Sequence, residues 1–410
     1  MPGGPTVRGV ALSSETPARL RLWSLAAMVA AGLLLIVLSA VMAAVKEQVR
    51  VIGEEAAPRA ATASDLYFGL SDLDAQVARM MLIRDDDRFA AAQADALSAY
   101  LRRSDEIDAD LQRAGTDAAA LRLADGLAVY RRQAWQALSG ESLGYYTQAT
   151  NTLHLELLPA ATELRDASQD QLADAYAEKR RTETAGIAVA VVLGGTVLVL
   201  LIGTQVFLAR RFRRLMNPSL IAATGVAAVL IVALGTVLVL QAKVLADARR
   251  DSLLPYLALS QARAVSYDAA ADTGRYLLNA NYQQDFDRKA GALSDGDAGL
   301  AALSGSDEVG KRWLGYRADH ERIVALADSG KRAEAIGALT GIRRGDAAFD
   351  FFYFDSAVGV VAERRQEEFA VALRDSDRLL AGWVVVPIAA LGLVIALVPL
   401  GVRRRLAEFR

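Results

Sequence analysis

Residues 185–209 read AGIAVAVVLGGTVLVLLIGTQVFLA, and after a loop that begins RRFRR, residues 221–242 read IAATGVAAVLIVALGTVLVLQA. Neither run contains a charged side chain, and about 20 apolar residues suffice to cross the hydrocarbon core of a bilayer as a helix. Two further runs of this kind occupy residues 22–45 and 379–402. Because a helix satisfies its own backbone hydrogen bonds in lipid, the sequence predicts four transmembrane helices.

The first run has an alternative interpretation. Val41 and Ala43 suit a signal peptidase, so a cleaved signal peptide is the alternative to a permanent span at residues 22–45. The run is long for the apolar region of such a peptide, which favours the uncleaved helix.

The distribution of charge predicts the orientation. Residues 1–21, 210–220 and 403–410 together contain 11 basic and two acidic residues, whereas the two long segments between the spans contain 35 basic and 46 acidic residues. Arginine clusters beside spans stay in the cytoplasm. We therefore expect a multi-pass protein of the plasma membrane with both termini inside and both long segments outside. Anionic lipid suffices as the partner of these arginines, so no nucleic acid is implied.

The long segments read as helix throughout. Leu66, Leu70, Leu73, Val77 and Met80 recur at intervals of three and four, which is the spacing of one helix face. Similar stripes follow, and each segment predicts a four-helix bundle. The expected organisation of this all-α membrane protein is a cytoplasmic tail (1–21), a span (22–45), an outer bundle (46–184), a span (185–209), a cytoplasmic loop (210–220), a span (221–242), a second outer bundle (243–378), a span (379–402) and a cytoplasmic tail (403–410).

The second half repeats the plan of the first, which predicts an internal duplication. Ser139-Gly140 recurs as Ser329-Gly330, and in each half a short helix is expected after this turn, at residues 141–150 and 331–340. Residues 349–354 add a dense group of aromatic side chains, Phe349, Phe351, Phe352, Tyr353 and Phe354. We expect them to form the bundle core and a contact with the twin bundle.

Few residues of this chain suit catalysis. It has no cysteine, and its two histidines, His154 and His320, have no partner at a metal-ligand spacing, so we expect both at a surface or interface. Asp85, Asp86 and Asp87 are more typical of a helix start than of a cation site, because consecutive side chains point in different directions. We expect no enzyme activity, no cofactor and no metal.

The spans also bear on function. They lack ionisable residues, which weighs against a pump or coupled transporter. They contain Gly194, Gly203 and Gln205, as well as Thr224 and Gln241, which favour close helix packing over a pore.

Three motifs resemble an actinobacterial family of four-span membrane proteins. They are the run Thr16-Pro17-Ala18-Arg19-Leu20-Arg21-Leu22, the run Asp65-Leu66-Tyr67 with Leu70-Ser71-Asp72-Leu73-Asp74-Ala75, and the closing run Gly401-Val402-Arg403-Arg404-Arg405-Leu406-Ala407-Glu408-Phe409-Arg410. The resemblance implies a transducer that works with an external glutamine-type solute-binding lipoprotein and the soluble protein kinase G in amino-acid sensing. It implies no catalytic residues.

Two functions therefore compete. One is a non-enzymatic transducer between an external binding protein and a cytoplasmic effector, and the other is a stand-alone small-molecule receptor or scaffold of the chemoreceptor-bundle type. The ligand and the oligomeric state, including a homo-oligomer, stay open. For an external partner, we expect contact at the bundle tips, through Asp85, Asp86, Asp87, Arg88, Tyr145, Tyr146, Asn279, Asn281, Tyr282, Arg343 and Arg344.

The predicted cytoplasmic segments are too short to fold alone, so any output is expected to pass to a separate protein. We expect this contact at the inner ends of the spans, through Arg210, Arg211, Arg213, Arg214, Arg403, Arg404 and Arg405. The alternative is that these arginines only set the topology.

Overall fold

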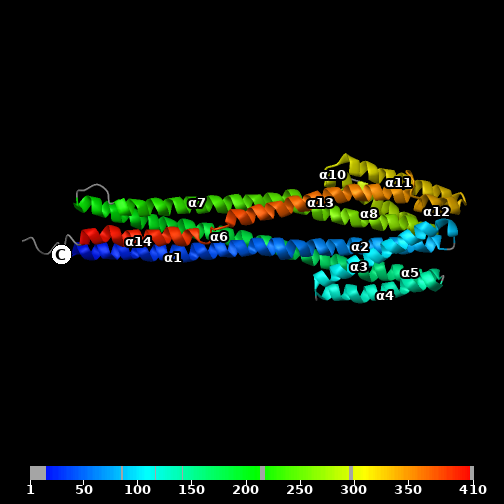
Figure 1. Ribbon diagram of the computed structural model, residues 1–410, viewed down its shortest axis with the longest axis horizontal. Coiled ribbons are helices and arrows are strands. Elements are labelled where there is room, and N and C mark those ends of the chain that lie inside the picture. Colours follow the sequence, from blue (N-terminus) through cyan, green and yellow to red (C-terminus); the bar gives the residue numbers. More distant parts are fainter. Residues whose placement is uncertain are drawn as a thin grey trace, which may run out of the picture. The chain divides into compact units, whose positions relative to one another are not determined.

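A computed structural model describes residues 15–84, 86–115, 117–140, 142–212, 218–294 and 299–406. Within these ranges all regular secondary structure is helical, which confirms the predicted all-α class (Figure 1). The chain forms two compact units. We call residues 1–51, 175–246 and 372–410 the apolar unit, and residues 52–174 and 247–371 the bundle unit.

The apolar unit contains α1 (Glu15–Val51), the last part of α6 (Leu158–Phe212), α7 (Pro218–Ala248) and α14 (Val386–Leu406). Among the described residues, three helical runs are long and apolar enough to cross a membrane by length and composition, namely Arg21–Ile83, Leu143–Arg210 and Pro218–Leu278. These runs include the predicted spans at 22–45, 185–209 and 221–242, and they fit a membrane protein.

The fourth predicted span differs from the expected single helix. Helix α13 (Ala347–Leu380) ends before a turn, and α14 starts only at Val386, so the apolar helix is the shorter Val386–Gly401. Gly382 has a φ of 81°, a left-handed conformation that ends helices, and Pro387 has no N–H with which to continue the bonds of α13. Residues 379–402 are therefore not one continuous helix, and a fourth crossing stays a prediction.

Small and polar residues mark helix contacts in the apolar unit, as expected. A Cβ at Gly194 would lie 2.6 Å from Ile231, and one at Gly203 would lie 2.8 Å from the Trp23 ring. Gln205 donates to Thr224 Oγ1 at 2.7 Å and joins α6 to α7. Such hydrogen bonds and close approaches hold helices together where lipid surrounds them.

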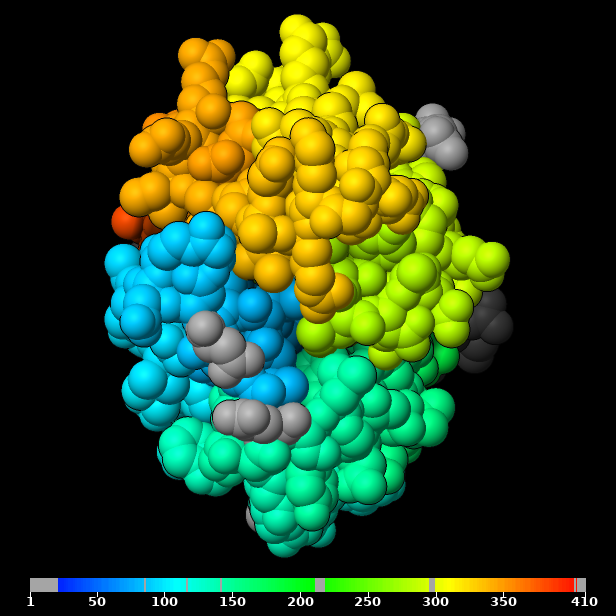
Figure 2. All heavy atoms as spheres, turned by 90° about the vertical axis from the view of Figure 1, so that its right-hand side faces the viewer, coloured from blue at the N-terminus to red at the C-terminus, as the bar shows by residue number. Residues whose placement is uncertain are grey.

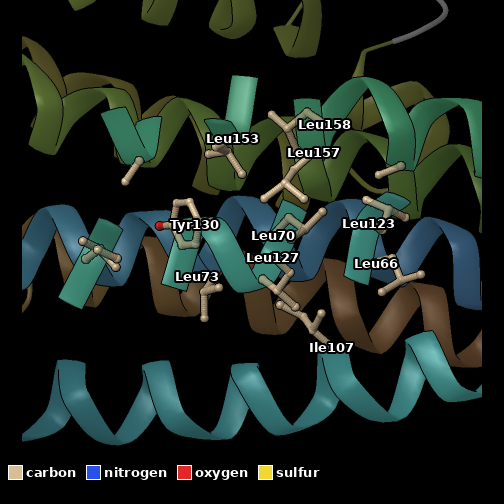
Figure 3. Packing of buried hydrophobic residues seen from close by; sticks show 14 of the residues in the cluster. Leu66, Leu70, Leu73, Ile107, Leu123, Leu127, Tyr130, Leu153, Leu157 and Leu158 are labelled. Carbon is tan, nitrogen blue, oxygen red and sulfur yellow. The ribbon is translucent and has the colours of Figure 1, made fainter. Parts of the chain in front are cut away.

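The first half of the bundle unit contains α2 (Ala57–Ile83), α3 (Ala90–Ala114), α4 (Ala118–Gly140), α5 (Leu143–Thr152) and the first part of α6. The predicted stripe on α2 forms the core, in which Leu66, Leu70 and Leu73 pack with Ile107 and Tyr130 (Figure 3). This burial of apolar surface is the main force that holds the helices together.

The second half contains α8 (Leu254–Leu278), α9 (Gln283–Ser294), α10 (Leu300–Ser304), α11 (Asp307–Asp328), α12 (Arg332–Thr340) and the first part of α13. Its core is aromatic. Trp313 stacks on Tyr316 with ring centroids 5.6 Å apart and contacts Phe354 at 5.2 Å. Helices α5 and α12 are the two short helices expected after the upper turns.

The two halves of the bundle unit are joined through α2 and α8, which pack along each other. Leu82 of α2 packs against the second core and Leu278 of α8 against the first. The sequence predicts two tandem bundles, whereas the structure forms one unit with two cores. Internal duplication itself stays a prediction.

Three wide turns of π-helix, absent from the sequence expectations, precede prolines. They are Ile52–Ala56, Leu153–Leu157 and Arg249–Leu253, followed by Pro58, Pro159 and Pro255 respectively. A proline ring lacks an N–H and collides with the carbonyl four residues earlier in a regular α-helix. A wider turn relieves this collision and lets the helix continue.

Candidate functional site

The bundle unit contains a cavity of about 590 Å³ between its two halves. Helices α2 and α3 form one wall, and α8, α11, α12 and α13 with the residues before it form the other. The lining is polar on the first wall and largely aromatic on the second. Its main members are Asp72, Gln76, Arg79, Asp95, Arg102 and Arg103 on the first wall, and Tyr267, Tyr316, Leu339, Ile342, Phe349, Phe351, Phe352, Tyr353 and Asp355 on the second. The volume is within the range of sites for small organic molecules.

The aromatic residues of α13 divide between the core and this cavity. Successive residues of a helix point about 100° apart, so a run of aromatics cannot lie on one face. Phe354 is buried against Trp313, as expected for the core. Phe351 contacts Tyr267 at 4.8 Å, and Tyr267 contacts Phe68 of α2 at 4.6 Å, which provides the expected contact between the halves. Phe352 instead lines the cavity and is 65% exposed.

Phe68 of α2 lies close to two arginines, of which Arg103 lines the cavity. The guanidinium carbons of Arg103 and Arg263 lie 4.3 Å and 4.6 Å from the centroid of its ring. Arg103 Nε donates to Asp72 at 2.8 Å, and Arg263 donates to Asp355 at 2.6 Å. Cation–π contacts and charge-assisted hydrogen bonds reinforce each other here. They connect α2, α3, α8 and α13 around one ring.

Arg79 has weaker hydrogen-bond and ion-pair partners than Arg103 and Arg263. Its Nη2 donates to the carbonyl oxygen of Thr340 at 3.3 Å, and its Nη1 lies 3.9 Å from Asp95. Burial lowers the pKa of Arg79, and Asp95 only partly opposes this effect. Of Arg79, Arg103 and Arg263, Arg79 therefore has the weakest pairing with a carboxylate.

A buried ion cluster joins α2 to α8. Arg275 of α8 is 0% exposed, and its guanidinium donates to Asp74 of α2 at 2.6 Å, to Asp268 at 3.1 Å and to Asp272 at 2.5 Å. Lys289 Nζ lies 2.6 Å from Asp268 and from Asp272. We call these five residues the ion cluster. Three carboxylates and two cations in this cluster leave one negative charge.

Arg275 and Lys289 favour the charged form of Asp268, whereas burial raises the pKa of Asp272 above its ordinary value. Burial opposes ionisation of Asp268, but Arg275 and Lys289 hold its pKa below the ordinary value. Tyr130 donates to Asp74 Oδ1 at 2.8 Å, and burial raises the pKa of this tyrosine well above its ordinary value. A buried charge without partners is strongly destabilising. Because a shift of α2 along α8 would separate Asp74 from Arg275, the cluster favours one register of the two helices.

The residues of the ion cluster were not among the predicted site residues, although the sequence contains a signal for them. Asp268, Asp272 and Arg275 follow each other at intervals of four and three, so they share one helix face. The buried residues of α8 include apolar side chains on this same face. Charged residues on a buried stripe indicate a paired cluster or a functional site.

The predicted tip turns gather at one end of the bundle unit, where the turns after α2, α4, α8 and α11 face the viewer in Figure 2. Asp86 and Asn279 cap the short helices that follow α2 and α8, and their side chains accept hydrogen bonds from the backbone N–H groups of Arg88 and Asn281. At the turns after α2 and α8, Asp87, Arg88, Asn279 and Asn281 are exposed, and Asp86 and Tyr282 are partly buried. Tyr145 is exposed on α5, and Arg343 and Arg344 are exposed in the segment between α12 and α13. Asp85 lies outside the described residues.

Tyr146 is not a surface residue, contrary to the prediction. It is 3% exposed and belongs to the core of the first half. Helix α5 turns this residue inward because Tyr146, Ala149 and Leu153 fall on one face of the helix. Of the neighbouring pair, Tyr145 is therefore the residue available to a partner.

The predicted output arginines lie on the ends of α6 and α14. Arg210 and Arg403 are exposed on these helices. Arg211 also belongs to α6, and Arg404 and Arg405 belong to α14. Arg213 and Arg214 lie outside the described residues.

The histidines occupy different environments. His320 is buried and stacks on Phe286 with centroids 3.4 Å apart, so its predicted surface or interface position is wrong. Burial lowers the pKa of His320 to about 4, and it packs as a neutral ring. His154 is partly buried, 4.0 Å from Asp268. In the described part of the chain, no group of histidine and acidic residues is arranged to hold a metal ion.

Asp319 gives the bundle unit a dependence on pH. Burial and the neighbouring Asp350 raise the pKa of Asp319 from its ordinary value of 3.8 to about 7. The folded state therefore holds this proton where the unfolded state has lost it, and stability falls as the pH rises between these two values. We therefore compare the melting temperature of Asp319→Asn with that of the wild type at two pH values. The variant should be more stable relative to the wild type at pH 8 than at pH 5. Equal differences at both pH values would contradict this.

The comparison with known families concerns the first half of the bundle unit. Residues 48–177 match the family model described as an actinobacterial sensor domain. No curated protein and no solved structure matches the chain. The matched residues include α2, α3, α4, α5 and the beginning of α6, and thus one wall of the cavity and Asp74 of the ion cluster. With three helical runs apolar enough to cross a membrane, this similarity supports a membrane protein that carries a sensor domain of the actinobacterial type.

Proposed function

We propose that the chain is a non-enzymatic membrane sensor whose bundle unit lies outside the cell and binds a small molecule in the cavity. The observation that carries this proposal is that both halves of the bundle unit line the same cavity. A molecule bound there contacts α2 and α8 together, so it can favour one arrangement of the two helices over another.

The helical runs provide a route for the signal. Asp72 at the cavity and Asp74 in the ion cluster belong to the run Arg21–Ile83. Tyr267 at the cavity and Arg275 in the cluster belong to the run Pro218–Leu278. Each run also contains a predicted span, so a shift or rotation of α2 against α8 passes along an unbroken helix. Output then goes to a separate cytoplasmic effector, as the sequence analysis expects.

Filling the cavity tests the proposal. Ala348 lines the cavity and is partly buried, so Ala348→Trp should fill part of it. Small molecules from a metabolite panel that raise the melting temperature of the full chain in nanodiscs should not raise that of the variant. Ala128→Trp, at an exposed position of α4, is the control. Equal stabilisation of wild type and Ala348→Trp by every active molecule would reject the cavity as the sensing site.

The orientation can be measured because the chain has no cysteine. Cysteines at Gly140 and Ser329 should react with an impermeant thiol reagent on intact cells, and a cysteine at Asn217 should react only after lysis. A Cβ at Gly140 meets no atom within 4 Å, so Gly140→Cys should fold normally. Labelling of Asn217→Cys before lysis would reverse the proposed orientation.

A second candidate is the relay between a solute-binding lipoprotein and a cytoplasmic protein kinase, in amino-acid sensing, which the family resemblance implies. The exposed Tyr145, Arg343 and Arg344 at one end of the bundle unit support it, since tyrosine and arginine are frequent interface anchors. Replacing the three with alanine should abolish capture of the lipoprotein by the purified chain. Unchanged capture would reject this surface as the contact.

A further inference from the structure

The state of Arg79 indicates what the cavity binds. Of its donors, Nη2 reaches the carbonyl oxygen of Thr340 at 3.3 Å, and Nε is buried without an acceptor in the described structure. Its nearest carboxylate, that of Asp95, is 3.9 Å away, and the Asp95 side chain is 70% exposed. By contrast, Arg103 and Arg263 donate to carboxylates at 2.8 Å and 2.6 Å. The site therefore holds a cation that is missing a close anion.

This arrangement is costly unless something completes it. The Arg79 side chain is 19% exposed, but its buried Nε loses hydration without a replacement, and burial lowers the pKa of the guanidinium. A planar guanidinium with free donors matches a carboxylate, which accepts two parallel hydrogen bonds. The two other carboxylates that line the cavity, Asp72 and Asp355, pair with Arg103 and Arg263.

The opposite wall of the cavity has apolar surface to cover. Ile342 is 78% exposed and Phe352 is 65% exposed, and both line the cavity. Phe349 and Leu339 continue this surface. Exposed apolar side chains that converge on a concave site favour a ligand with an apolar body.

We propose that the cavity binds a small amphipathic carboxylate, whose carboxylate pairs with Arg79 and whose apolar body packs on Ile342 and Phe352. This inference rests on the proposed role of the cavity as the sensing site. Binding pairs the charge of Arg79 on α2 and covers the apolar surface of Ile342 and Phe352 on the other wall. The ligand therefore contacts both walls of the cavity.

Three probes of one shape test this proposal: hydrocinnamate, hydrocinnamyl alcohol and phenylpropylamine. Their affinities for the full chain in nanodiscs can be measured by calorimetric titration. We expect hydrocinnamate to bind about tenfold or more tightly than the other two, because a hydrogen-bonded charge pair is worth more than a neutral contact. Arg79→Gln should remove this preference, and Ile342→Ser should weaken all three probes.

Controls separate the possible results. Arg88→Gln, at an exposed residue outside the cavity, should keep the preference, and melting temperatures verify that each variant folds. Arg79→Lys keeps the charge but loses the planar fork, so it should retain part of the preference. If the alcohol or the amine binds as tightly as hydrocinnamate and Ala348→Trp blocks it, the carboxylate proposal is wrong and the sensing cavity stands. If no probe binds, the carboxylate proposal is wrong. If the probes bind Ala348→Trp as tightly as the wild type, the sensing cavity is rejected as well.

Discussion

Replacing Arg275 with methionine is expected to lower the free energy of unfolding by about 3–5 kcal/mol, because it leaves buried carboxylates without their main partner. Asp74, Asp268 and Asp272 each accept hydrogen bonds from this guanidinium, and Asp74 and Arg275 are fully buried. Chemical denaturation of the full chain in detergent, followed by circular dichroism, measures the loss.

Arg288→Met is the matched control for this variant. Arg288 lies on α9 next to Lys289, and its side chain is 73% exposed and pairs with Asp285. Exposed ion pairs contribute little, so this variant should stay close to the wild type. Asp74→Asn combined with Arg275→Met should cost less than the sum of the single changes, since the two residues interact directly. Additive losses, or a stable Arg275→Met, would contradict the ion cluster as the joint between α2 and α8.

Trp313→Ala is expected to cost about 3–5 kcal/mol, because it empties the centre of the second core. Trp313 is 1% exposed and contacts Tyr316 and Phe354. Since Tyr316 also lines the cavity, the same change should weaken ligand binding.

Trp135→Ala removes the same side chain from an exposed position of α4 and should be nearly neutral, since Trp135 is 66% exposed. Trp313→Phe should cost less than Trp313→Ala, because it keeps a ring and removes an indole N–H that has no acceptor among the described residues. A stable Trp313→Ala measured by the same denaturation would show that the second core does not depend on this residue.

The sequence predicted those parts of the fold that depend on local patterns. The stripe of Leu66, Leu70 and Leu73 predicted the face of α2 that packs in the first core. Uncharged runs predicted the apolar helices, and turn residues placed the short helices α5 and α12. Each of these features is determined by residues close together in the chain.

The cavity and the ion cluster could not be predicted in the same way. Asp74 and Arg275 are 201 residues apart, and their contact depends on the packing of α2 against α8. The same applies to Arg79 and Ile342, which line one cavity only because both halves belong to one unit. For Tyr145 and Tyr146, the type of residue suggested an interface, but only the phase of α5 shows which of the two points outward.

The wide turn at Leu153–Leu157 restricts which insertions and deletions this segment tolerates. Leu153 and Leu157 are buried at the two ends of this turn, which holds one more residue than a turn of regular α-helix. Deleting one residue here would bring the ring of Pro159 against a carbonyl group and turn all later side chains by about 100°. The number of residues between Thr152 and Pro159 is therefore fixed by packing.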